Sequence, residues 1–178
     1  MLAPKVLAAL FALTGVAFFV YWLVVRPSSG MTASMTDWPY VLWFSATLLS
    51  LAVALPLFGR MVGGRWVIRS ASIAGAAVGL SSVANIFEDG FRIDGFFLAF
   101  ILGVLIMDVA LVALTVVIAR TGRGGSRLLA LVPAATIVGT IFFIDAGGAI
   151  MLVTWLAAAA AAPALPVRTA TAPMALAP

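Results

Sequence analysis

The chain has 178 residues, of which 65% are hydrophobic and only 9% are charged, and its mean hydropathy is +1.24. A soluble domain keeps about a quarter of its residues charged, so this chain has too few charges to cover a water-facing surface. It contains no cysteine and no histidine, which excludes disulfides, thiol nucleophiles, Ser-His-Asp triads and Cys/His zinc sites. The composition predicts an integral membrane protein.

The net charge is +4, and the cations lie in short segments between apolar runs. The positive-inside bias of membrane proteins produces that placement, so membrane lipids rather than nucleic acid are the expected partners. A bound metal would be a hard cation held by carboxylate and carbonyl oxygens. We expect neither a metal nor another cofactor.

The first apolar run extends from Val6 to Val25 and is closed by Arg26-Pro27. Its length exceeds the ~7–15 residues of a signal-peptide core, and no small-x-small cleavage pattern follows directly. It is long enough to cross a bilayer. We predict an uncleaved transmembrane helix over residues 6–25.

Three further runs predict helices over residues 40–58, 70–87 and 96–119. Aromatic residues typical of the membrane interface open the second run. Two basic turns separate the runs, and each contains three arginines: Arg60, Arg65 and Arg69 in one, Arg120, Arg123 and Arg127 in the other. Short loops of this kind belong on the cytoplasmic side. Alternation then places the N-terminus in the cytoplasm and the acidic loop from Glu88 to Asp94 outside, in a multi-pass protein of the cell membrane.

The segment from Leu128 to Leu165 is too long for one crossing, because 38 residues span about 57 Å as a helix. We predict helices over 128–144 and 149–162 with a turn at Asp145, which gives six helices. The alternative is a single tilted helix near Pro133–Trp155, with Trp155 at the outer surface and Asp145 in the membrane, which gives five. The Ala/Pro/Thr-rich tail, residues 163–178, is expected to be disordered and cytoplasmic.

Asp108 lies in the middle of the fourth run, and no Lys or Arg lies at matching depth. A charged Asp there costs about 2.5–3.5 kcal/mol on insertion scales, so we expect it inside the bundle, either protonated or held by hydroxyl and amide donors. Thr115 shares its helical face. Run centres place other hydroxyls at similar depth: Thr14, Ser50, Ser81, Ser82 and Thr136. A proton relay and a structural hydrogen-bonding role both fit Asp108.

Small residues form a stripe on the third helix at Ala71, Gly75 and Gly79, and the same face continues to Ser82 and Asn85. Such a stripe lets neighbouring helices approach closely. We interpret it as a packing surface, with a substrate-lining surface as the alternative.

The outer acidic group contains Glu88, Asp89 and Asp94. Its spacing does not match the twelve-residue calcium loop, and Arg92 can neutralise a neighbour, so we interpret it as a solvated loop. The glycine-rich basic turns lack the Lys-Ser/Thr ending of a phosphate loop. Anionic lipid headgroups are their expected partners.

These patterns predict an all-α integral membrane protein, a bundle of six (or five) transmembrane helices with short loops. The predicted function is non-enzymatic: a bundle that binds a small or lipidic ligand, or an accessory subunit of a larger membrane complex. A proton-coupled small-molecule carrier that uses Asp108, with Ser82 and Asn85 along its path, is the main alternative. A membrane enzyme that uses the outer carboxylates is the third.

Overall fold

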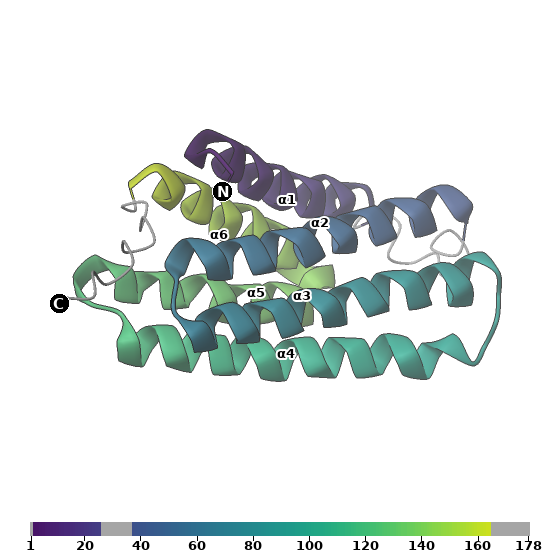
Figure 1. Ribbon diagram of the computed structural model, residues 1–178. Coiled ribbons are helices and arrows are strands. Elements are labelled where there is room, and N and C mark those ends of the chain that lie inside the picture. Colours follow the sequence, from purple (N-terminus) through teal and green to yellow (C-terminus); the bar gives the residue numbers. More distant parts are fainter. Residues whose placement is uncertain (1, 26–36, 165–178) are drawn as a thin grey trace, which may run out of the picture.

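The computed structural model describes residues 2–25 and 37–164, which form an all-α bundle without strands in these ranges (Figure 1). The predicted fold class is thereby confirmed. The helices are α1 (Pro4–Val25), α2 (Trp38–Val62), α3 (Arg65–Asn85), α4 (Phe96–Thr121), α5 (Leu131–Ile141) and α6 (Gly148–Ala161). Five helical segments are long and apolar enough to cross a membrane, and residues 145–161 form a shorter apolar helix.

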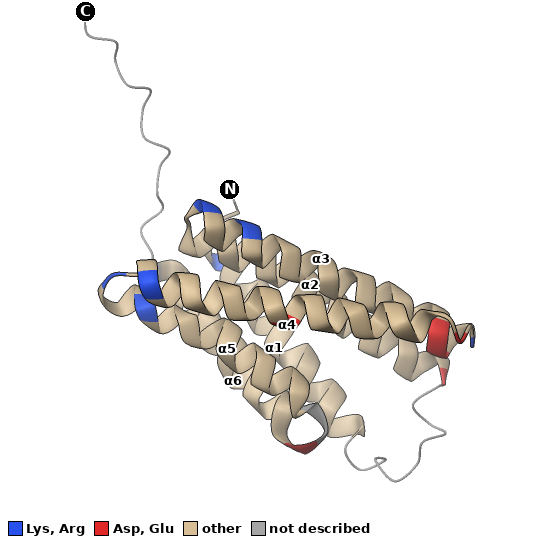
Figure 2. Ribbon diagram, turned by 90° about the horizontal axis from the view of Figure 1, so that it is seen from below, with Lys and Arg blue, Asp and Glu red and all other residues tan. Residues whose placement is uncertain are grey.

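The helices pack in chain order, each against the next, and α6 returns to lie along α1. The closest associations are α2 with α3, α3 with α4, and α1 with α6. Figure 2 shows that α5 and α6 diverge from α4 toward the end that carries Asp145. Helix α3 therefore lies between α2 and α4, with neighbours on both flanks.

The chain turns at Asp145, as the six-helix prediction requires. Asp145 is exposed in a π-helical turn, Phe143–Gly147, between α5 and α6. Trp155 has no exposed surface, and its ring packs against Phe11 and Phe58 at centroid distances of 5.5 and 6.2 Å. The alternative of one tilted helix with Trp155 at the surface is therefore wrong.

Two helix starts differ by three or more residues from the predicted bounds. Helix α3 begins at Arg65, so Arg65 and Arg69 lie on the helix and the turn consists of Gly63 and Gly64, whose φ angles of 81° and 94° favour glycine. Residues 124–130 form a 3-10 helix before α5. Pro133 explains that break, because it has no N–H to donate to the carbonyl of residue 129 and its ring crowds that carbonyl.

Charge is separated along the bundle. Figure 2 shows the lysine and arginine residues of the described chain gathered at one end, apart from Arg92 in the acidic loop. The acidic residues lie at the other end, apart from Asp108 in the middle of α4. Both arginine-bearing turns thus share one end, which we call the basic end.

The described tail is short: Ala162–Ala164 forms a single 3-10 turn after α6. The remainder of the tail predicted to be disordered, from residue 165 onward, lies outside the described residues, as does the segment 26–36.

Candidate functional site

The small-residue stripe of α3 faces α2. Ala71 is fully buried beside Gly59, and a Cβ built on Gly75 would lie 2.6 Å from the Ala52 carbonyl oxygen and 2.7 Å from Cδ of Pro56. Gly79 has more space, since its Cβ would meet nothing closer than Ala52 Cβ at 3.9 Å. The stripe is therefore covered by the protein's own helix α2, most tightly at Gly75.

Ser82 and Asn85 join α3 to α2 through a buried hydrogen-bond cluster. Ser82 Oγ donates to the Ser45 carbonyl at 2.8 Å, and Ser45 Oγ donates to the Ser82 carbonyl at 3.3 Å. Asn85 Nδ2 donates to Ser45 Oγ at 3.1 Å. All three residues are at most 5% exposed, so these hydrogen bonds hold α3 against α2 inside the bundle.

The opposite flank of α3 contacts α4 just as closely. Ser81 Oγ donates to the Phe100 carbonyl at 3.1 Å. Gly103 lies against Ser81 Oγ. A Cβ built on Gly103 would lie 2.8 Å from the Ala77 carbonyl oxygen. Any side chain at position 103 would push the two helices apart.

Asp108 is half-buried on α4, and its Oδ1 atom is enclosed without a hydrogen-bond partner in the described part of the chain. Thr115, predicted to share its face, donates instead to the Leu111 carbonyl at 2.8 Å. Thr14 donates to the carbonyls of Leu10 and Ser50. The hydroxyls that were predicted at this depth thus serve main-chain carbonyls, and Asp108 Oδ1 receives none of them.

The outer acidic group lies on a π-helical turn, Ile86–Gly90, and the loop after it. Glu88 and Asp89 are half-buried, and Asp94 is exposed. Trp38 packs across Gly90 and contacts Phe91 edge-on at 5.1 Å. Within the described ranges, no three acidic, cysteine or histidine side chains are grouped closely enough to hold a metal.

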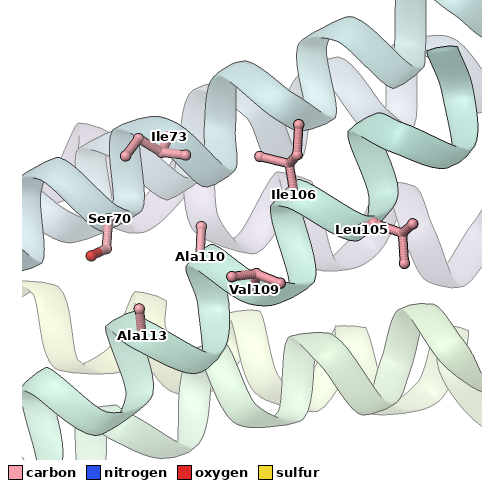
Figure 3. Close-up of a pocket in the computed structure, with 7 residues that line it drawn as sticks. All are labelled: Ser70, Ile73, Leu105, Ile106, Val109, Ala110 and Ala113. Carbon is pink, nitrogen blue, oxygen red and sulfur yellow. The ribbon is translucent and has the colours of Figure 1, made fainter.

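A groove between α3 and α4 was not predicted from the sequence. Its volume is about 380 Å³, and it lies on the side of α4 away from Asp108. Figure 3 shows the side chains that line it. They are Ser70 and Ile73 of α3 and Leu105, Ile106, Val109, Ala110 and Ala113 of α4. The sequence signal for its floor is weak, because Ala110 and Ala113 are small and three positions apart on α4 but Ala99 and Gly103 of the same helix are small as well.

The groove opens outward. Val109 is 71% exposed, and Leu105, Ile106 and Ile73 are also exposed, whereas Ala110 is buried at the base. In a bilayer these exposed side chains meet lipid tails. The comparisons with known proteins add no assignment, since no family model, curated protein or solved structure matches the chain.

The α2–α3 contact yields a test with a matched control. We expect Gly75→Ala to lower the free energy of unfolding in detergent by about 1–3 kcal/mol, because its methyl group overlaps Ala52 and Pro56. Gly79→Ala should leave stability unchanged or raise it by up to about 1 kcal/mol, because the site is open and alanine favours helix. Denaturant titration followed by circular dichroism measures both. Equal effects of the two substitutions would contradict the assigned packing.

Proposed function

We propose that the protein is a non-enzymatic membrane bundle that holds a lipid acyl chain in the groove between α3 and α4. The observation that carries the proposal is the chemistry of the groove wall. Six of its seven side chains are aliphatic, and the seventh, Ser70, offers one hydroxyl. A hydrocarbon chain needs nothing more than such a wall, whereas a polar solute needs several placed polar groups.

The size of the groove supports the same ligand class. A volume of about 380 Å³ is near the lower limit of ordinary ligand sites, ~300–1,000 Å³. Its long axis follows α4 from Leu105 to Ala113, about 12 Å at 1.5 Å per residue. That is most of the ~15 Å depth of one hydrocarbon leaflet.

The accessory-subunit reading receives less support. The α3 stripe that would offer a close-packing surface to another subunit is occupied by α2 of the same chain. The enzymatic reading, which uses the outer carboxylates Glu88, Asp89 and Asp94, is weaker again, because none of them lines the groove that would hold a ligand.

For location, we propose the cell membrane with the basic end and the N-terminus in the cytoplasm. The support is that both arginine-bearing turns share one end of the bundle, as the positive-inside bias requires of cytoplasmic loops.

Proton-coupled carriage is the second candidate, and one observation favours it: Asp108 holds an enclosed carboxyl oxygen without a partner. Intramembrane acids often serve proton relays. The groove, however, does not include Asp108. A carrier requires a polar route to this residue that the groove does not provide.

Filling the groove tests the first proposal. Ala113 is exposed on its floor near the basic end, and Ala113→Phe should reduce the fraction of purified protein that retains phospholipid several-fold, because about ten atom contacts of ~0.1–0.2 kcal/mol are lost. Native mass spectrometry from detergent measures that fraction. Ala46→Phe, at an exposed position of α2, is the matched control and should retain lipid as the natural protein does. Equal retention by both variants would refute the groove as the binding site.

Proton permeability distinguishes the second candidate. If Asp108 is structural, vesicles that contain Asp108→Asn should acidify at the same rate as vesicles with the natural protein after a pH step, because the amide preserves the shape and hydrogen-bonding capacity of the side chain. A pH-sensitive dye inside the vesicles reports the rate. Faster acidification with the natural protein alone would establish a proton path through Asp108.

A further inference from the structure

Resting on the proposed acyl-chain site, we infer that its occupant is an anionic phospholipid whose phosphate is bound at the basic end by Arg69 and Arg120. The groove wall specifies only a hydrocarbon chain. The headgroup preference comes from residues that continue the two sides of the groove beyond its apolar part.

Arg120 continues the α4 side. Residues seven apart in an α-helix differ by about 20° around its axis, so Ala113 and Arg120 lie on one face, about 10 Å apart along the helix. Leu105 and Val109 lie on the same side. Arg120 is exposed in the last turn of α4. It therefore lies about two helical turns beyond the groove floor on the same face, at the depth where the apolar part of the helix ends.

Trp66 and Arg69 continue the α3 side. Trp66 precedes the lining residues Ser70 and Ile73 by four and seven positions, so the three share a face. It is 62% exposed, as expected of an aromatic ring at the membrane interface. The Arg69 guanidinium lies 5.7 Å from the centroid of the Trp66 ring. This contact holds a cation beside the mouth of the groove.

Charge and length both match an anionic phospholipid. The distance from Leu105 to Arg120 is about 22 Å along α4, enough for one leaflet of hydrocarbon and the start of the headgroup region. Guanidinium groups bind phosphate oxygens through paired N–H donors. A zwitterionic lipid fills the apolar groove equally well but presents no net charge to the arginines.

The experiment uses Trp66 as a reporter. The protein is reconstituted in vesicles of phosphatidylcholine or phosphatidylglycerol, each with and without bromine on the acyl chains, and quenching of tryptophan fluorescence is compared with that of Trp66→Phe to isolate the Trp66 signal. Competition between the two lipids gives their relative affinity. We expect phosphatidylglycerol to be preferred about fivefold or more at Trp66, since an arginine near an anionic surface contributes about that factor. The preference should fall as salt is raised.

Paired variants separate a built site from a general attraction to a basic surface. Arg69→Gln with Arg120→Gln should abolish the preference. Lys5→Gln with Arg60→Gln removes the same charge from exposed positions of α1 and α2, which supply no lining residue of the groove, and should preserve it. Equal quenching of the natural protein by the two lipids would overturn the inference without any variant. Equal losses in both double variants would also overturn it.

The outcomes distinguish this inference from the proposed function. Lipid retention that is sensitive to Ala113→Phe but indifferent to headgroup refutes the anionic site and leaves the acyl-chain site. A groove covered by a second copy of the chain would exclude both brominated lipids, and Val109→Cys, the chain's sole cysteine, would then form a disulfide-linked dimer. That result refutes both proposals.

Discussion

Separation of charge along the bundle is the constraint on which the structure depends. Lipid tails cannot solvate an ionised side chain, so each charged residue of a spanning segment is costly. The described chain meets this constraint by keeping its lysines and arginines, apart from Arg92, at one end and its carboxylates, apart from Asp108, at the other. With the ends fixed in this way, the apolar residues between them need only pack. Among the described spanning helices, Asp108 is the acidic residue that lies away from both ends, and its Oδ1 atom is enclosed without a hydrogen-bond partner.

Packing between the ends is set by close approach to α3. Without a hydrophobic driving force between helices in lipid, association relies on tight contact and interhelical hydrogen bonds. Gly75 allows close contact between α3 and α2, and Gly103 allows it between α4 and α3. Ser45 of α2 donates a hydrogen bond to α3, and Ser81 of α3 donates one to α4. Helices α3 and α4 approach closely at Gly103. Nearer the basic end the small side chains Ala110 and Ala113 leave space that no other residue fills, and the groove results.

The sequence predicted the elements that follow from composition and spacing. The apolar runs predicted the helical class, the excess length of the last run predicted the turn at Asp145, and the spacing of small residues predicted the packing face that includes Gly75. The sequence did not predict features that require side chains from two helices together. The groove requires the side chains of α3 and α4 together, and α4 is so uniformly apolar that no face of it stands out. The hydrogen bonds of Ser82 and Asn85 to Ser45 were not predicted for a similar reason, since Ser45 lies 37 positions away from Ser82 on another helix. The predicted helix began at residue 70, so Trp66 and Arg69 were assigned to the preceding loop. In the structure both lie on α3, on the face that continues toward the groove.

The groove and the separation of charge favour the same kind of ligand. The apolar groove extends from the middle of α4 toward the basic end, and Arg69 and Arg120 lie beyond its lining on that side. A single ligand with a hydrocarbon tail and a negative head therefore satisfies both features. Neither feature explains Asp108, which lies on another face of α4.

The sidedness of the two arginine-bearing turns tests this account most directly. Single cysteines introduced by Arg60→Cys and Gly125→Cys, in a chain with no other cysteine, can be labelled with a membrane-impermeant maleimide, and Asp94→Cys marks the opposite end. The account predicts that Arg60→Cys and Gly125→Cys react only after the membrane is opened, whereas Asp94→Cys reacts in intact cells. Labelling of Arg60→Cys and Gly125→Cys from opposite sides would contradict it.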